Sequence, residues 1–400
     1  MQTRIMGKTG EKVSALGFGF MRLPLIDGSK DTRNPYKEID EEKTQEMLHF
    51  AIDNGVNYFD TAYIYHGGKS EIFLGKYLSR ELRKKIMLAT KSPLWLAKQE
   101  SDLDRLLDEQ LQRLNTDKLD FYLLHGLNRF LWPLAKSLHV FSFLERIQKD
   151  GRVKHVGFSF HDDIKCFKEI IHYYDWSFVQ IQYNYLDENY QAGREGLEFA
   201  SQKGLGVVVM EPLRGGRIVS PLPLPVQKIF ADSGVSRSPA DWGLSWVLNH
   251  PQVSVVLSGM SSLEQLKENR AITENAHANS FSMNELETIQ KAKIEFQKLM
   301  KVPCTSCAYC MPCPAGVAIP TLFSLYNDYF MFEDGATAAF LYQNMVPPKM
   351  RANNCLSCGK CEIQCPQNLK IIELLKDVHS ALGSGDRKST RLNSSHGKLS

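Results

Sequence analysis

The chain has 400 residues, 43% of them apolar and 23% charged, so it can bury a large core and form one large domain with a small one. Its 48 basic and 45 acidic side chains leave a net charge of only +3, which gives no reason to expect a nucleic acid or a membrane surface as partner. The N-terminal segment MQTRIMGKTG lacks the apolar stretch of a secretory signal, and no apolar run is long enough to span a bilayer, so we expect a cytoplasmic location. The nine cysteines, mostly two or three residues apart, favour metal ligation in a reduced compartment over disulfides.

Short runs of β-branched and aromatic residues alternate along the chain with longer amphipathic stretches, which is typical of parallel strands joined by helices. Eight strands are predicted, beginning at Val13, Tyr58, Ile86, Asp120, His155, Phe178, Gly206 and Val253. Helices are predicted between them at Glu41–Asn54, Ser70–Lys84, Ser101–Leu114, Val140–Lys149, Asp163–Tyr173, Tyr190–Lys203 and Pro239–Asn249.

Eight strands with a helix after nearly every one favour an α/β fold of the closed (β/α)8 TIM barrel type over a doubly wound sheet. A dinucleotide-binding sheet would need a glycine fingerprint after a strand. The chain has Gly17 and Gly19 but Arg22 where the third glycine should be, so we reject that alternative.

In a TIM barrel the chemistry lies at the C-terminal ends of the strands. Four polar residues fall there: Asp60, Tyr65, Lys91 and His125. A phenol can act as a general acid, and a nearby ammonium makes its proton easier to lose. A carboxylate would hold the lysine, and a neutral imidazole could donate a hydrogen bond to a carbonyl oxygen. Because this set contains no nucleophile or metal, it needs an external hydride, which a nicotinamide would supply.

The segments FDTAYIY, ATK and YLLH, in this order and spacing, resemble those of the aldo-keto reductases. The resemblance covers about residues 1 to 300 and implies a barrel that binds NAD(P)H without a Rossmann unit. It makes Asp60, Tyr65, Lys91 and His125 the catalytic set, with Tyr65 as the proton donor.

The same resemblance implies that Ser159 and Gln180 hold the nicotinamide carboxamide, although many members have an asparagine where this chain continues with Phe160 and His161. Further cofactor contacts are expected from Glu211, Leu213, Gly259, Met260, Gln265 and Asn269.

The preference between NADP and NAD stays open in the sequence. Many members carry Lys or Arg near the position of Gly259 to pair with the 2'-phosphate of NADP, whereas the nearest cation here is Lys267. A phosphate without a bidentate partner loses much of its binding.

Eight cysteines lie in two runs beyond residue 303, whereas Cys166 stands alone on a predicted helix and is expected to be an inert core thiol. The two runs are CTSCAYCMPCP, from Cys304, and CLSCGKCEIQCP, from Cys355. The second has the C-x2-C-x2-C-x3-C-P spacing of bacterial iron–sulfur ferredoxins, which favours clusters over zinc, the alternative for paired C-x2-C motifs.

The region resembles the dicluster ferredoxin appendage of a subset of aldo-keto reductase-like proteins. The ferredoxin rule implies two 4Fe-4S clusters. Their ligands would be Cys304, Cys307, Cys310 and Cys365 for one cluster, and Cys355, Cys358, Cys361 and Cys313 for the other.

We therefore predict a barrel over residues 1–300 and a small, mainly helical ferredoxin-like domain over residues 301–382. Residues 383–400 have no apolar periodicity and resemble a translated sequencing adapter. We expect this tail to be a disordered artefact and the natural C-terminus to be missing.

The predicted function is NAD(P)H-dependent reduction of an aldehyde or ketone, or the reverse alcohol oxidation, with iron–sulfur clusters for electron transfer. The alternative is an electron-transfer or structural iron–sulfur protein that links nicotinamide to a redox partner and has a weakly active barrel. Because hydride transfer needs no one-electron carrier, the clusters would serve structure or exchange with a ferredoxin or flavoprotein.

Overall fold

The computed structural model describes residues 1–29, 37–219, 222–304, 309–332, 334–365 and 367–383. Cys307 and the predicted tail from residue 384 onward lie outside these ranges. The chain forms two compact units, the first made of residues 1–222 and 229–290 and the second of residues 223–228 and the chain from 291 onward. The division at residue 290 falls inside helix α12 (Met283–Lys298), and the domain boundary near Lys301 stays a prediction.

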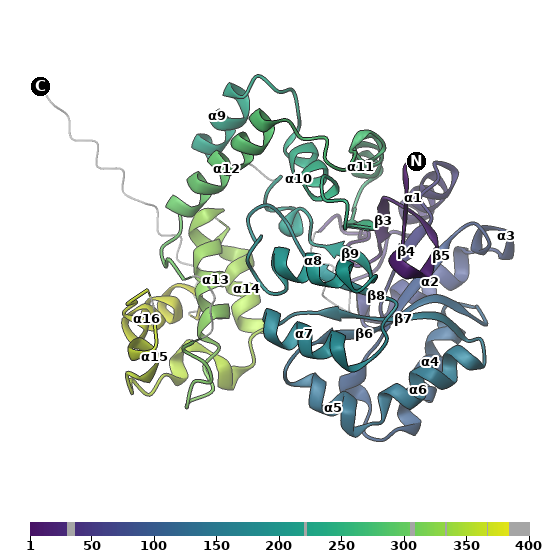
Figure 1. Cartoon of the computed structure of the whole chain (residues 1–400), viewed down its shortest axis with the longest axis horizontal. Helices are drawn as coiled ribbons and strands as arrows, with labels where there is room; N and C mark the ends of the chain where they lie inside the picture. Colours follow the sequence, from purple (N-terminus) through teal and green to yellow (C-terminus); the bar gives the residue numbers. More distant parts are fainter. Residues whose placement is uncertain (30–36, 220–221, 305–308, 333, 366, 384–400) are drawn as a thin grey trace, which may run out of the picture. The chain divides into compact units, whose positions relative to one another are not determined.

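The first unit is a closed barrel of eight parallel strands, which follow one another around it in the order β10-β3-β4-β5-β6-β7-β8-β9 (Figure 1). These strands are β3 (Leu16–Gly19), β4 (Tyr58–Asp60), β5 (Met87–Ser92), β6 (Leu119–Leu127), β7 (Val153–Phe160), β8 (Phe178–Gln182), β9 (Gly206–Met210) and β10 (Val255–Gly259). The prediction of a (β/α)8 TIM barrel is confirmed.

The alternation of side chains along the strands explains why polar groups reach the barrel mouth. Residues two apart on a strand point to the same face. Tyr58 of β4 and Ala89 of β5 belong to the packed apolar interior. Asp60 and Lys91 follow them by two residues, so they face the same interior at its C-terminal end, where TIM barrels place their active sites.

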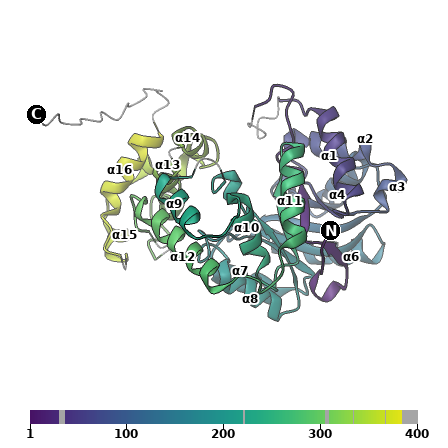
Figure 2. The ribbon, with the colours of Figure 1, turned by 90° about the horizontal axis from the view of Figure 1, so that it is seen from above.

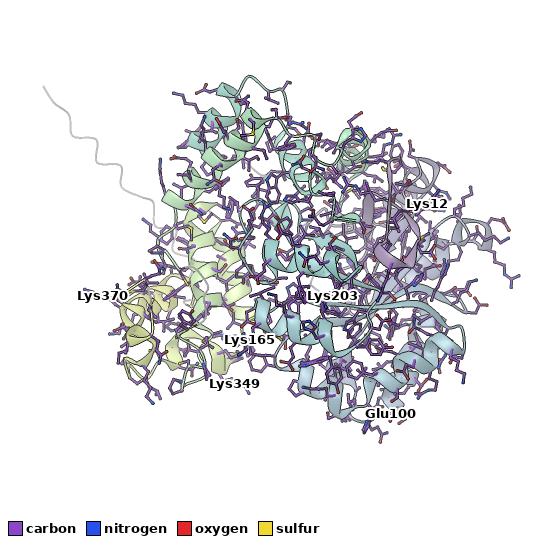
Figure 3. The ribbon with its side chains drawn as sticks, in the orientation of Figure 1. Lys12, Glu100, Lys165, Lys203, Lys349 and Lys370 are labelled. Carbon is purple, nitrogen blue, oxygen red and sulfur yellow. The ribbon has the colours of Figure 1, made fainter. Side chains whose placement is uncertain are left out.

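Helices follow the strands along the chain (Figure 2), and most of them bury apolar side chains. In chain order they are α1 (Glu41–Asp53), α2 (Lys69–Tyr77), α3 (Arg80–Arg83), α4 (Ser101–Arg113), α5 (Leu131–Ser137), α6 (Val140–Lys149), α7 (Ile164–Tyr173), α8 (Gly193–Gln202), α9 (Leu224–Asp232), α10 (Pro239–Leu248), α11 (Leu263–Asn275) and α12. Side-chain oxygens of Asp40, Asp163, Ser238 and Ser262 cap four of these helices by accepting from a backbone N–H of the first turn. Charged residues such as Lys12, Lys165 and Lys203 point outward (Figure 3).

Two predicted elements were wrong in extent. The strand predicted from Val13 is divided, because the Ser14 N–H donates to the Asn57 side chain at 2.6 Å and interrupts the strand. The part before the break, β2 (Lys12–Ser14), pairs antiparallel with β1 (Thr3–Ile5). The predicted helix Ser70–Lys84 is α2 and α3, because Leu78 is extended and the Ser79 side chain caps the second helix.

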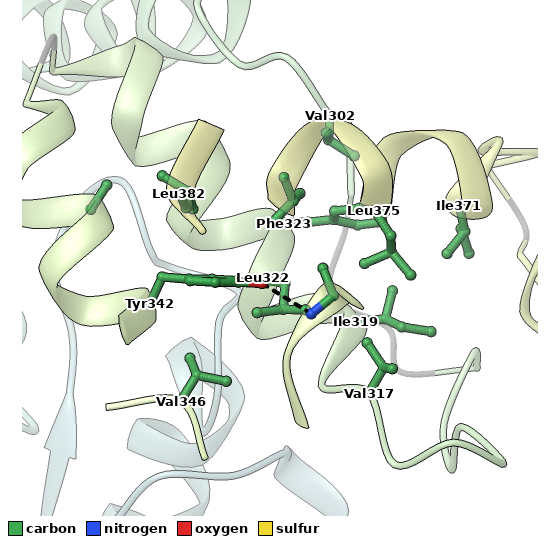
Figure 4. Close-up of a cluster of buried hydrophobic side chains, with 13 residues drawn as sticks. Val302, Val317, Ile319, Leu322, Phe323, Tyr342, Val346, Ile371, Leu375 and Leu382 are labelled. Atoms are coloured by element: carbon green, nitrogen blue, oxygen red, sulfur yellow. Dashed lines mark hydrogen bonds between the residues drawn. The ribbon is translucent and has the colours of Figure 1, made fainter. Parts of the chain in front are cut away.

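The second unit contains four α-helices after α12 among its described residues: α13 (Ile319–Met331), α14 (Gly335–Asn344), α15 (Lys360–Ile363) and α16 (Ile371–Leu382). They enclose an apolar core that includes Leu322, Phe323, Leu375 and Tyr342 (Figure 4). The Tyr342 hydroxyl accepts from the Ala352 N–H at 3.2 Å, so this polar group in the core is satisfied.

None of the helices in the described ranges combines the length and the apolar character that crossing a membrane requires.

Candidate active site and cysteine region

The four residues predicted for catalysis come from three neighbouring strands of the barrel. Asp60 ends β4, and Tyr65 begins a short 3-10 turn, η2 (Tyr65–Gly68), in the loop that follows. Lys91 lies near the end of β5 and His125 near the end of β6. The barrel order β4-β5-β6 therefore gathers them at one side of the mouth.

Lys91 is at the centre of the group. Its Nζ donates to Asp60 Oδ1 at 2.5 Å and to the Thr61 carbonyl at 2.8 Å, and it lies 3.3 Å from Tyr65 Oη. The side chains of Asp60 and Lys91 are each only 1% exposed. A buried ion pair of this kind holds its geometry, because breaking it would leave a charge without compensation.

The electrostatics of the group follow from its burial. Burial raises the pKa of Asp60, and the Lys91 charge opposes that rise. Burial alone would lower the pKa of Lys91, but the charge of Asp60 and the hydrogen bonds with Asp60 and Tyr65 raise it above its usual value, so the ammonium stays charged. Burial also raises the pKa of Tyr65, while Lys91 acts to lower it. The phenol therefore keeps its proton at neutral pH, next to the Lys91 charge that would stabilise the phenolate.

His125 lies across from the tyrosine. Its ring centre is 6.1 Å from that of Tyr65 in an edge-on arrangement and 5.2 Å from that of Trp95, which is partly exposed. Burial and the nearby Lys91 charge hold the pKa of His125 well below its usual value, so the imidazole is neutral. Within the described chain His125 Nδ1 has no hydrogen-bond partner. The ring is therefore available to a polar group of a bound molecule.

The backbone after Tyr65 is unusual. His66, Gly67 and Gly68 have φ values of 52°, 65° and 92°, so three consecutive residues are in the left-handed region, which is costly for a non-glycine residue. His66 Nε2 accepts from the Leu23 N–H at 3.3 Å, and burial lowers the pKa of His66 to about 4. This neutral, buried histidine connects the loop that carries Tyr65 (residues 61–68, called the tyrosine loop) to the segment after β3.

Two predicted carboxamide ligands, Ser159 and Gln180, are register partners on β7 and β8. Both are 1% exposed. Ser159 Oγ accepts from the Gly126 N–H at 2.7 Å, which leaves its own proton free to be donated, and Gln180 Oε1 has no partner among the described atoms. A buried amide oxygen without a donor is costly, so this place fits a group that supplies one, such as a carboxamide.

After Ser159, Phe160 turns into the apolar core and is fully buried. His161 Nδ1 lies 3.2 Å from Gln191 Oε1. The position directly after Ser159 therefore offers no side-chain amide.

The other predicted cofactor residues are unequally accessible. Gly259, Gln265 and Glu211 are exposed, whereas Met260 is 1% and Asn269 4% exposed. Gln265 Oε1 accepts from the Ser261 N–H at 2.9 Å, and Asn269 Nδ2 donates to Ser258 Oγ at 3.1 Å, so the two side chains connect α11 to the loop before it and to β10. Leu213 is half-buried and lies over Gly243 of α10.

Sequence reasoning missed Arg22 as a candidate for phosphate binding. A methyl group placed on Gly215 would lie 3.0 Å from Arg22 Nη2, and one on Gly259 would lie 3.2 Å from Arg22 Cδ. No described carboxylate forms an ion pair with Arg22, whereas Lys267 extends over the ring of Phe50 at 5.7 Å. The signal was present in the motif GFGFMR, but it was interpreted only as a missing glycine.

The loop from Glu211 to Gly216 turns through left-handed residues, with φ values of 50°, 69° and 91° at Arg214, Gly215 and Gly216. Successive backbone N–H groups in such turns can form a concavity that suits an anion. Arg214 itself is engaged, because its Nε donates to Asp187 Oδ2 at 2.9 Å.

In the second unit both cysteine runs lie against one apolar core. The cysteines partly buried against it are Cys304, Cys310, Cys313, Cys355, Cys361 and Cys365, whereas Cys358 is exposed. Burial raises the pKa of Cys361, and Cys355 and Cys313 are near enough to add to that rise. Across the described ranges no three acidic, histidine or cysteine side chains converge as ready-made metal ligands. The runs thus share a core, and Cys313 of the first run lies near the second.

Comparison with known proteins agrees with both units. Residues 16–292 match the Aldo/keto reductase family and residues 303–369 match the 4Fe-4S dicluster domain. The chain is 28% identical to the 6-dehydroglucose reductase of Novosphingobium aromaticivorans, over 66% of this chain and 88% of that protein. It is 27% identical to the L-galactose dehydrogenase of Arabidopsis thaliana, over 68% of this chain and 89% of that protein.

Among solved structures, an aldo-keto reductase from Bacillus halodurans in its holo form matches with a TM-score of 0.60 and 27% identity. The match covers 73% of this chain and 96% of the bacterial one. The family match spans more than half of the chain and coincides with the barrel. The chain belongs to the aldo/keto reductase family, as an oxidoreductase-type barrel followed by a 4Fe-4S dicluster domain.

Proposed function

We propose that the barrel catalyses NAD(P)H-dependent reduction of an aldehyde or ketone, or the reverse oxidation of an alcohol. The observation that carries this proposal is the placement of Lys91 Nζ 2.5 Å from Asp60 Oδ1 and 3.3 Å from Tyr65 Oη. A charged ammonium next to a protonated phenol is the arrangement that general-acid catalysis of carbonyl reduction needs.

In the proposed mechanism Tyr65 donates its proton from Oη to the carbonyl oxygen of the substrate. Lys91, kept charged by Asp60, stabilises the phenolate that remains. His125, neutral because it is buried, donates a hydrogen bond to the same oxygen and orients the substrate. A reduced nicotinamide bound at the mouth would supply the hydride to the carbonyl carbon.

We propose Ser159 and Gln180 as the residues that hold the carboxamide of the cofactor. The partnerless Oε1 of Gln180 supports this role, because a carboxamide N–H would satisfy it. When bound, the nicotinamide would be held by these two residues of β7 and β8. Cofactor contacts from Glu211, Leu213, Gly259, Met260, Gln265 and Asn269 remain part of the proposal.

Arg22 is proposed to face a cofactor phosphate between Gly215 and Gly259. A guanidinium can bind a phosphate through two parallel hydrogen bonds. The variant Arg22→Met separates the two candidate cofactors: KM rises for NADPH alone if Arg22 binds the 2'-phosphate, and for NADPH and NADH alike if it binds the pyrophosphate. Unchanged KM values for both cofactors would remove this role.

The test of the main proposal is anaerobic consumption of NADPH and NADH over a panel of aldehydes and ketones, with the parent and Tyr65→Phe compared. Loss of activity in the variant supports Tyr65 as the acid. Equal rates in the two proteins would overturn the mechanism.

For the second unit we propose two 4Fe-4S clusters. Cys304, Cys307, Cys310 and Cys365 would hold one, and Cys355, Cys358, Cys361 and Cys313 the other. The packing of Cys313 and Cys365 against the same apolar core as the opposite run supports the exchange of the last cysteine between the runs. The clusters would exchange electrons with a ferredoxin or flavoprotein partner. NAD(P)H-driven reduction of the clusters in anaerobic protein tests this, and clusters that stay oxidised with excess cofactor would assign them a structural role.

A further inference from the structure

A second buried polar cluster lies behind the active site, outside the barrel wall. We call it the Glu71 cluster; it consists of Glu71 of α2, Thr90 of β5, and Gln110 and Arg113 of α4. None of these residues was singled out from the sequence, and the proposed mechanism does not use them. A buried carboxylate with no part in the chemistry needs another explanation, since its burial is costly.

Glu71 accepts from every member of the cluster. Its Oε1 lies 2.7 Å from Thr90 Oγ1 and 2.6 Å from Gln110 Nε2, and its Oε2 lies 3.3 Å from Arg113 Nη1. The Glu71 side chain is fully buried, whereas Arg113 is 26% exposed. Because all three neighbours donate, both carboxylate oxygens are needed as acceptors, and a protonated acid would leave one donor unsatisfied.

The cluster contacts the two elements that carry the phenol and the ammonium. Gln110 Nε2 donates to the Lys91 carbonyl at 3.1 Å, which fixes the end of β5. Arg113 Nη1 donates to the Tyr63 carbonyl at 3.3 Å, and its guanidinium lies 4.0 Å above the Tyr63 ring. Tyr63 precedes Tyr65 by two residues in the same loop, so Arg113 holds the loop that carries the phenol.

The packing of α2 against α4 brings these groups together. A methyl group on Gly75 of α2 would lie 2.0 Å from the Arg113 carbonyl, so only glycine allows the two helices to approach this closely. The Tyr122 hydroxyl donates to Gln110 Oε1 at 3.0 Å, which orients the Gln110 amide with its nitrogen toward Glu71 and Lys91.

We propose that Arg113 and Glu71 are positioning residues that set the separation of Tyr65 Oη and Lys91 Nζ. They do so by fastening the tyrosine loop, through the Tyr63 carbonyl, and the end of β5, through Gln110, to one buried carboxylate. The proposal rests on the proposed carbonyl reduction, because the separation matters only if the phenol is the acid. Displacement of a catalytic group by about 1 Å can cost about a hundredfold in rate.

The test replaces Arg113 and follows the tyrosine loop without relying on turnover. In Arg113→Met, amide exchange of residues 61–68 becomes about tenfold faster while the exchange of α8 is unchanged, because only the local fastening is lost. Turnover falls about a hundredfold with KM for the nicotinamide cofactor unchanged. Arg113→Lys, which keeps a charged donor, restores most of both properties. Should Arg113→Met not fold, Arg113→Gln takes its place with the same expectations.

The matched control is Arg146→Met on α6, since Arg146 is exposed and its printed ion pairs are with Glu100 and Asp104, away from the loop of residues 61–68. It leaves loop exchange and turnover at the level of the parent. Unchanged exchange of residues 61–68 in Arg113→Met, or an equal rise throughout the barrel, would overturn the positioning role. Faster exchange of residues 61–68 in Arg113→Met, together with full activity of Tyr65→Phe, would keep the role of Arg113 in holding the loop. It would remove the proposed function instead.

Discussion

The two units of this chain hold their reactive side chains by different means. In the barrel the Lys91 charge is balanced by Asp60 at 2.5 Å, and a second buried carboxylate, Glu71, fastens the surrounding backbone. In the second unit six of the described cysteines lie partly buried against an apolar core. The Lys91 charge is therefore balanced within the chain, whereas the cysteine region, in the proposed function, depends on an added metal charge.

The largest expected effect tests that dependence. Cys361→Ala removes one proposed ligand and is expected to release about half of the bound iron, since each run contributes to a separate cluster. Amide protection of α15 and α16 is lost as well, because metal binding and folding are coupled. Iron content and hydrogen exchange measure the two effects. Cys166→Ala, in the barrel, is the control that keeps the iron, and full iron content in Cys361→Ala would contradict the assignment.

The next effect concerns the chemistry of the barrel. Tyr65→Phe is expected to lower kcat/KM for carbonyl reduction about a thousandfold, equivalent to about 4 kcal/mol, because the general acid is lost. Steady-state kinetics measure it, and the iron content stays as in the parent. Tyr77→Phe removes a hydroxyl that donates to Glu41, outside the proposed site, and leaves the rate unchanged. A similar rate for both variants would show that Tyr65 is not the acid.

A smaller effect is expected on stability. Lys91→Met leaves the Asp60 carboxylate buried without a cation, and the free energy of unfolding of the barrel falls by about 3 kcal/mol. Lys76→Met breaks the exposed pair with Glu41 and costs less than about 1 kcal/mol. Urea unfolding of the two variants measures both losses in the free energy of unfolding. Addition of Asp60→Asn to Lys91→Met recovers part of the loss, and equal losses in Lys91→Met and Lys76→Met would contradict the buried pair.

The smallest effect is a pH dependence that originates at His66. Its pKa is lowered from 6.5 to about 4 in the folded chain, so between these values the unfolded chain binds more protons. Stability therefore falls as the pH drops below 6.5, by about 2 kcal/mol at pH 4.5. Urea unfolding at several pH values shows a shallower decline in His66→Gln than in the parent. The exposed His49 provides the control, since His49→Gln leaves the pH dependence of stability unchanged. If stability declined with falling pH as steeply in His66→Gln as in the parent, His66 would not be the origin of the pH dependence.

Much of the barrel could be predicted from sequence because strand periodicity and strand-end chemistry are local signals. The runs ending at Asp60, Lys91 and His125 each show a buried strand followed by one polar group, and strands in a TIM barrel end at the same face. The hairpin of β1 and β2 was not predicted, because two strands of three residues each are too short to show alternation.

The supporting contacts could not be predicted because they depend on tertiary packing. Gln110 and Arg113 occur in an amphipathic helix, where polar residues are usually on the solvated face. Only the close approach of α2 and α4 at Gly75 brings them to Glu71 and Lys91. Arg22 was misjudged for the same reason, since its neighbours Gly215 and Gly259 are about two hundred residues away in the chain.

The isolation of Cys166 has a practical consequence. It is the only thiol in the first three hundred residues and is 9% exposed, and burial raises its pKa to about 12. An alkylating reagent applied to native protein is therefore expected not to modify Cys166. Mass spectrometry of the alkylated protein then gives, for each preparation, the number of cysteines that are not bound to iron.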